Sequence, residues 1–236
     1  MKQGRNTIII AILATVPLFA NGQTGGNEQG AAPRRDYEVH DIGALDALIQ
    51  LGQLYDQPMG IVCGDKKIAT THVSVRAHQA TTQEAMTLLI GQLPGYEWGD
   101  RSGVVLVQPR VLPLLSEKML QTVIPKFVAK DSGTEQLSAL LWWELQRRLD
   151  PESAGTGYWG ISHDPVRIGL IDLSNVTTGE VLSEIVRRRK SAAWVVLPPP
   201  ETLKGTPRER LWGIVTYTNP AQPLDRLCCL NREYFR

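Results

Sequence analysis

The sequence predicts an α+β fold made of two tandem small domains, each with the element order β-α-β-β-α-β-β and with helices packed between or against small sheets. Two windows carry this prediction, Val75–Ile90 and Ile171–Val186, which align without a gap. Trp98 and Trp194 follow the two windows at the same distance. A repeat of this length indicates one structural unit that is used twice.

Each window has the pattern of a strand that leads into a capped helix. Thr81 with Glu84, and Thr177 with Glu180, have the spacing of a capping box, in which each side chain hydrogen-bonds the other residue's backbone N–H. Losing such a cap costs about 1 kcal/mol. The apolar positions that follow share one helical face in each copy: Ala85, Met86, Leu89 and Leu93, then Val181, Leu182, Ile185 and Val186.

The N-terminus has the organisation of a secretory signal peptide over residues 1–22. Lys2 and Arg5 form the basic region, Thr7–Ala20 is apolar, and the small residues Ala20-Asn-Gly22 provide a cleavage site after Ala20 or Gly22. The alternative is a membrane anchor, but a span needs roughly 20 apolar residues and this run is shorter. We therefore expect the mature protein in the periplasm or outside the cell, with residues 23–36 as a flexible leader.

The first domain is expected over residues 37–109. Its predicted elements are a strand at 37–42, a helix capped by Asp41 and ended by Pro58, strands at 59–63 and 72–78, a helix at 82–93, and strands at 96–98 and 104–107. Residues 110–121 are a predicted linker with Pro113 and one helical turn.

The second domain is expected over residues 122–219 and repeats the first. Its predicted elements are a strand at 122–129, a helix at 134–149, strands at 157–162 and 166–171, a helix at 178–190, a strand at 193–197, a loop at 198–210 and a strand at 211–217. Residues 220–236 form a C-terminal tail.

The composition fits a globular protein with a packed core, at 42% hydrophobic and 21% charged residues. The formal net charge of +1 gives no global electrostatic argument for nucleic acid or an anionic membrane. Export permits disulfides, but three cysteines cannot all pair within one chain. Cys63 could join Cys228 or Cys229, or all three could be buried or free thiols.

Residue types used in catalysis gather at His40-Asp41 and Ser162-His163-Asp164. Adjacency in sequence does not assemble a catalytic triad, and polar strand ends and caps account for both groups. His72 and His78 fall on one strand face, about 20 Å apart, too far to share a metal ion. The sequence therefore predicts no enzyme, no catalytic or metal-binding residue and no cofactor.

Three basic clusters, Arg147-Arg148, Arg187–Lys190 and Arg208–Arg210, raise the possibility of nucleic-acid binding. The first two fall near helix C-termini, where the helix dipole favours cations. No nucleic-acid partner is expected. Trp142-Trp143 occupies adjacent positions of the predicted helix 134–149, so both rings cannot face one core, and the pair is our predicted partner-binding site.

The stretch Val73–Leu89 resembles the short N-terminal domain shared by secretins and TonB-dependent receptors. In that family a strand leads into a helix start of the form (Thr/Ser)-x-x-Glu-Ala-Leu-x-x-Leu-Leu, matched here by Thr81, Glu84, Ala85, Met86 and Leu89. The better match spans about residues 37–109. The second copy matches in its later half, where Val181 replaces the alanine. The resemblance implies an α+β fold in a bacterial envelope and a non-catalytic role in docking onto partner proteins.

The leading functional hypothesis is an exported, two-domain, non-enzymatic module that engages an envelope protein. Addition of a partner strand to an exposed sheet edge is one mode available to small open sheets. The alternative is a small periplasmic enzyme or ligand-binding protein with a site in the cleft between domains. The partner's identity and the oligomeric state are left open.

Overall fold

The computed structural model describes residues 32–64, 68, 71–149, 166–196 and 212–216, which belong to one compact unit. The first half of the chain contains β1 (Arg35–Gly43), α1 (Ala44–Tyr55), β2 (Met59–Val62), β3 (His72–Ala80), α3 (Thr82–Gly91), β4 (Tyr96–Arg101) and β5 (Val104–Pro109). Helix α4 (Leu114–Gln121) joins it to the second half. That half contains β6 (Val123–Ala129), α5 (Thr134–Leu149), β7 (Ile171–Thr177), α6 (Thr178–Arg189), β8 (Ala192–Val196) and β9 (Trp212–Thr216). The predicted α+β class is confirmed.

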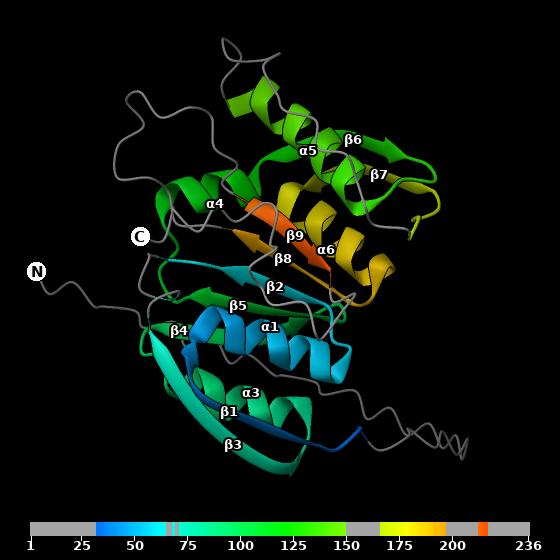
Figure 1. Cartoon of the computed structure of the whole chain (residues 1–236). Coiled ribbons are helices and arrows are strands. Elements are labelled where there is room, and N and C mark those ends of the chain that lie inside the picture. Colours follow the sequence, from blue (N-terminus) through cyan, green and yellow to red (C-terminus); the bar gives the residue numbers. More distant parts are fainter. Residues whose placement is uncertain (1–31, 65–67, 69–70, 150–165, 197–211, 217–236) are drawn as a thin grey trace, which may run out of the picture. The chain divides into compact units, whose positions relative to one another are not determined.

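The strands form three sheets. β1 and β3 pair antiparallel as a first outer sheet, β6 and β7 pair antiparallel as a second outer sheet, and a central sheet has the order β4-β5-β2-β8-β9. Figure 1 shows α1 and α3 between the first outer sheet and the central sheet, with α6 and α5 between the central sheet and the second outer sheet. The layers therefore alternate sheet, helices, sheet, helices, sheet.

The central sheet contains strands from both halves of the chain. β2 pairs in parallel with β5 on one side and with β8 on the other, with Gly60 opposite Trp194. The two predicted domains thus correspond to two halves that meet in one hydrogen-bonded sheet.

Alternate residues of the central strands enter two different cores. Ile61, Val107 and Val195 belong to the first core, beneath α1 and α3. Val62 and Trp194 belong to the second core, beneath α6. Because successive side chains of a strand point to opposite faces, a strand covered on both faces is apolar throughout. This explains why every residue of β2 and β8 is buried.

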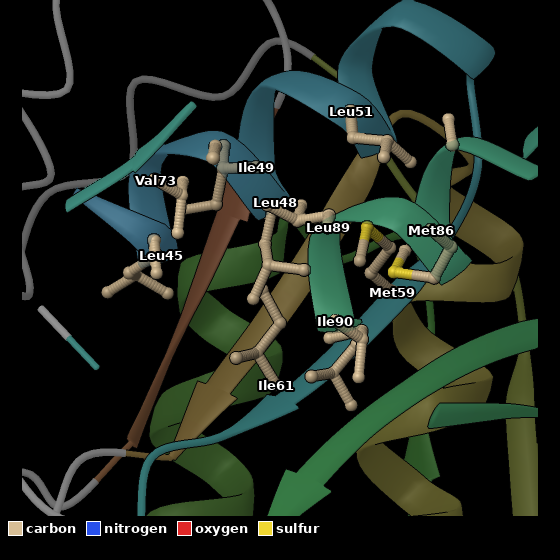
Figure 2. Close-up of a cluster of buried hydrophobic side chains, with 14 of the residues drawn as sticks. Leu45, Leu48, Ile49, Leu51, Met59, Ile61, Val73, Met86, Leu89 and Ile90 are labelled. Atoms are coloured by element: carbon tan, nitrogen blue, oxygen red, sulfur yellow. The ribbon is translucent and has the colours of Figure 1, made fainter. Parts of the chain in front are cut away.

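The first core is formed by side chains from both helices and the central sheet. In Figure 2, side chains of α1 meet those of β2 and α3; the labelled members include Leu45, Leu48, Ile49, Leu51, Met59, Ile61, Met86, Leu89 and Ile90. Each large apolar side chain removed from water in this way contributes about 1.5–3 kcal/mol. The predicted apolar residues of α3 and α6 are buried, although α3 ends at Gly91 and Leu93 lies just beyond it.

The internal repeat is visible in the backbone. Both predicted capping boxes are present, Thr81 with Glu84 and Thr177 with Glu180. In addition, the residue three positions before the first residue of α1, α3, α5 and α6 has a left-handed backbone conformation. These residues are Asp41, Gln79, Asp131 and Asn175, with φ between 46° and 54°. A left-handed non-glycine residue is uncommon, so its recurrence at all four junctions shows that the same turn leads into each of these helices.

Three expectations from the sequence are corrected. Asp41 does not cap α1: Gly43 occupies the N-cap position and no side-chain hydrogen bond caps the helix. Residues 110–121 are not an open linker with one turn, since α4 spans eight of them. The strand expected at 166–171 begins only at Ile171, and before it Ile168 makes a single bridge to Ser132. The expected strand at 157–162 and the loop at 198–210 lie outside the described residues.

Candidate partner-binding surface

Helix α5 carries the two predicted partner-binding residues. Leu137, Leu141 and Leu145 fall on one face of this helix and are fully buried in the second core. Trp142 is half-buried and packs against the same core, and its neighbour Trp143 is also half-buried. The helix therefore directs these three leucines inward, leaves both indoles at the margin of the core and exposes Leu140. Their role in binding a partner stays a prediction.

Helix α5 also contains buried oxygen atoms without a hydrogen-bond partner. Within the described part of the chain these are Glu135 Oε2, Ser138 Oγ and Gln146 Oε1. A buried polar atom left unpaired costs about 1–3 kcal/mol. Ser138 and Gln146 lie one turn before and one turn after Trp142 on the helix. Two buried oxygen atoms next to this tryptophan on the helix, Ser138 Oγ and Gln146 Oε1, thus have no hydrogen-bond partner among the described residues.

A second exposed region was not anticipated as a site. Val111 and Leu114 are 85% and 81% exposed, the highest values among the large apolar side chains that the structure describes. They belong to the run Val111-Leu-Pro-Leu-Leu115, which leads into α4. Leu112 packs against the second core, and Met119 and Leu120 bury the other end of α4. The run is therefore held in place on both sides while two of its side chains face solvent.

The sequence contained one signal for this region. Five consecutive apolar residues stand outside any periodic helix or strand pattern, and such runs are exceptional on a solvated surface. Large exposed apolar groups commonly mark contacts with other proteins. We name residues 111–115 the junction segment.

His40, Asp41, His72 and His78, which the sequence singled out, all lie exposed on the strands of the first outer sheet. His72 Nδ1 is 2.9 Å from Asp41 Oδ1, and His78 Nδ1 is 2.8 Å from Asp36 Oδ1. The backbone N–H of Gln79 donates to Asp36 Oδ1 and, with the nearby His78, holds the pKa of that carboxyl below its usual value. These contacts are cross-strand pairs between β1 and β3.

Ser74 stands near one of these pairs but is not joined to it as a nucleophile. Its Oγ accepts a hydrogen bond of 2.9 Å from the backbone N–H of Asp41, and these two described side chains, Ser74 and His72, are not hydrogen-bonded to each other. An activated serine requires a hydrogen bond to its base. In the described part of the chain, no group of three or more His, Cys, Asp or Glu side chains is placed to hold a metal ion. Ser162, His163 and Asp164 lie outside the described residues.

The basic clusters on α5 and α6 are engaged by carboxylates of the same helices. Arg147 and Arg148 pair with Glu144, and Arg187 and Arg188 pair with Glu184. Burial by itself would raise the pKa of Glu184, but hydrogen bonds from Arg188 and Arg187 outweigh burial and lower it. The arginines are thus partly neutralised helix-end residues. Arg208–Arg210 lies outside the described residues.

Side chains also occupy open edges of the outer sheets. In the first half, the Gln92 amide bonds both backbone groups of Ser74: Nε2 donates to the carbonyl at 2.6 Å and Oε1 accepts from the N–H at 3.1 Å. In the second half, the repeat-equivalent Arg188 donates to the carbonyl of Leu170, the residue equivalent to Ser74. A strand added at the open edge of β3 would have to displace Gln92, which hinders strand addition at Ser74. Leu170 directly precedes β7, so Arg188 covers the chain just before that strand.

Cys63 is fully buried. Cys228 and Cys229 lie outside the described residues, so the pairing considered for Cys63 stays undecided. No helix in the described part of the chain has the length and apolar character needed to cross a membrane. The chain matches no protein-family model and no curated protein.

Proposed function

We propose that this protein is an exported, non-enzymatic docking module that engages an envelope protein through the junction segment. The observation that carries the proposal is the exposure of Val111 and Leu114 on a segment anchored by buried neighbours. An anchored segment loses little conformational entropy when it binds, which favours affinity. The signal-peptide pattern of residues 1–22 supports export.

The chemistry expected of the partner follows from these side chains. Full burial of a valine or leucine contributes about 1.5–3 kcal/mol, so the two together could dominate a modest interface. Around them, Arg110, Glu117 and Lys118 are exposed and of mixed charge. The partner should therefore present an apolar pocket with a polar rim.

The non-enzymatic part of the proposal is supported by how the described ionisable side chains are used. The aspartates near His72 and His78 complete cross-strand pairs on an exposed sheet face. Exposed pairs of this kind contribute little to stability and are open to solvent, unlike the water-excluded sites in which acid–base groups are usually tuned.

The test is site-specific photo-crosslinking in the envelope of the native host, with the photoreactive residue at position 114. We expect one reproducible protein adduct that is lost in Val111→Ser and strongly reduced when the same crosslinker is placed at position 88. Leu88 is the matched control, since it is 49% exposed on α3. Adducts only between copies of this chain, or equal adducts from both positions, would contradict the proposal. Crosslinking from positions 142 and 143 decides separately whether Trp142 and Trp143 take part, and N-terminal sequencing of the mature protein checks cleavage after Ala20 or Gly22.

A further inference from the structure

Strand β4 is an edge of the central sheet, and its ladder with β5 fixes which of its backbone groups face outward. Asp100 stands opposite Val105, whose N–H donates to the Pro58 carbonyl at 2.9 Å, away from β4. Hydrogen-bonded and non-hydrogen-bonded pairs alternate along an antiparallel ladder. Glu97, Gly99 and Arg101 therefore bond to β5, while Trp98 and Asp100 direct their N–H and C=O groups to the open side.

The hairpin turn between β4 and β5 indicates the same alternation of hydrogen-bonded and non-hydrogen-bonded pairs. Ser102 and Gly103 both have positive φ, 55° and 81°, as in a two-residue type I′ turn. Such a turn is closed by a hydrogen-bonded pair, here Arg101 with Val104. Among the described residues, no side chain or loop hydrogen-bonds to the outward backbone groups of Trp98 and Asp100. At Ser74, in contrast, Gln92 hydrogen-bonds to the outward backbone groups.

The side chains of β4 are arranged in a self-complementary way. Glu97, Gly99 and Arg101 alternate onto one face of the sheet, with opposite charges at equal distances from the glycine. Both charged side chains are exposed. Glu97 Oε1 accepts a bond of 3.0 Å from Gln108, which leaves Oε2 for a further donor, and a Cβ built on Gly99 meets no atom within 4 Å.

We propose that β4 pairs antiparallel with β4 of a second copy about a two-fold axis at Gly99, joining two central sheets into one. In this register Trp98 faces Asp100 of the second copy, so outward backbone groups meet outward backbone groups and two hydrogen-bonded pairs form. Glu97 then faces Arg101 of the second copy, and Arg101 faces its Glu97.

Charge selects this register over its neighbours. Shifting the axis by half a residue would set outward groups against inward ones and lose the hydrogen bonds. Shifting it by one residue keeps them but places Glu97 or Arg101 opposite glycine, which removes both ion pairs. Opposite charges directly across two strands stabilise the pairing and like charges destabilise it. A mixed pair placed symmetrically about a glycine matches itself, which favours a second copy over an unrelated strand.

The test is sedimentation velocity of the mature chain over a range of concentrations. Wild type should show a concentration-dependent dimer that weakens at high salt. Glu97→Arg and Arg101→Glu should each lower the association constant of the dimer by about tenfold or more. Each substitution replaces both symmetry-related ion pairs by pairs of like charge. The double variant Glu97→Arg/Arg101→Glu should dimerise as wild type does.

A mixture of the two single variants gives the sharpest readout. One copy then carries arginine at positions 97 and 101 and the other carries glutamate at both, so a heterodimer should form although neither variant dimerises well alone. Misfolding of the variants could not produce that result. Lys130→Glu, an exposed charge directly after β6, is the matched control and should leave the dimer unchanged. A monomer at every concentration, or a dimer that is indifferent to these charges, would overturn the proposal. Adducts formed from position 114 should be unaffected by the β4 variants, so the two proposals can fail independently.

Discussion

The first and second halves of the chain contain equivalent strands and helices but contribute unequally to the central sheet. The first half supplies β4, β5 and β2, and the second supplies β8 and β9. Helix α6 of the second half packs on β2 and β5 of the first half as well as on its own β8. Helix α1 of the first half packs on β8 of the second half. The first half therefore builds most of its own sheet, and the second half depends on strands that it does not encode.

The outer sheets differ in a related way. The first outer sheet has two register shifts, one cross-strand ion pair between Glu38 and Arg76, and two aspartate–histidine contacts, Asp41 with His72 and Asp36 with His78. The second has a regular register, one cross-strand ion pair, and exposed Val123 and Val128. Register shifts and charges at edges hinder edge-to-edge pairing. The same repeated unit thus has a more strongly protected outer surface in the first half.

The largest effect should come from separating the halves. We expect the fragment of residues 23–113 to fold with reduced stability, because it keeps a three-stranded sheet and nearly all of the first core. The fragment of residues 110–236 should not fold cooperatively, because its share of the described central sheet is two strands and two-stranded sheets are marginal in water. Thermal unfolding followed by circular dichroism measures both. A cooperative transition in both fragments would show that each half is an autonomous domain, as the sequence predicted.

A smaller effect is expected from a substitution at Gly60, which lies against Trp194 where the two halves meet. A Cβ added to Gly60 would lie 2.2 Å from Trp194 Cζ2, so the indole or the strand must move. Gly60→Ala should lower the free energy of unfolding by about 1–3 kcal/mol, as overpacking typically does. Gly91→Ala in α3 is the control, since nothing lies within 4 Å of the added atom there and Gly91 belongs to neither proposed interface. Urea denaturation of the full chain compares them. Equal stabilities would mean that Trp194 does not press on Gly60.

The parts of this fold that the sequence could predict are the local ones. A capping box spans four residues, so Thr81–Glu84 and Thr177–Glu180 predict both helix starts without information from the rest of the chain. The shared sheet could not be derived in this way. The apolar runs of β2 and β8 indicate burial on both faces, but nothing within either run says that its neighbour lies more than a hundred residues away.

Features that depend on the backbone conformation could not be predicted from the sequence either. Asp41 has a residue type that favours caps, but its left-handed backbone places its carboxylate against His72 and leaves the N-cap position to Gly43. Pro113 was expected within a linker with one helical turn, whereas it stands at the N-cap position of the eight-residue helix α4. The junction segment could be recognised as apolar, but its exposure follows from how α4 is anchored in the second core. Sequence reasoning therefore selected Trp142 and Trp143, whose aromatic character is visible without a structure.

The smallest expected effect is the pH dependence of the stability that the two helix caps contribute. In the first half, Glu84 Oε2 accepts the Thr81 backbone N–H at 2.7 Å and the Thr81 hydroxyl at 3.1 Å, and Arg34 lies 3.4 Å away. The Thr81 bonds, foremost the backbone one, hold the pKa of Glu84 below its usual 4.5, with Arg34 adding to the effect. A depressed folded-state pKa contributes stability that is present above pH 4.5 and is lost as the pH falls through the lower folded value. Glu84→Gln should therefore lower the melting temperature at pH 7 and have a much smaller effect near pH 3.

The equivalent change Glu180→Gln sharpens the comparison. Its cap has the same backbone and hydroxyl bonds, at 2.6 and 3.0 Å, but no arginine among the described residues is paired with it. If Arg34 matters, the Glu84 variant should lose more at pH 7 in low salt, and the difference between the variants should shrink in high salt, because exposed charges are screened. If the two variants behave alike at both salt concentrations, the backbone bonds alone account for the caps. A loss from Glu84→Gln that is the same at pH 3 and pH 7 would contradict the linkage, since it would mean that the effect does not arise from the charge of the carboxylate.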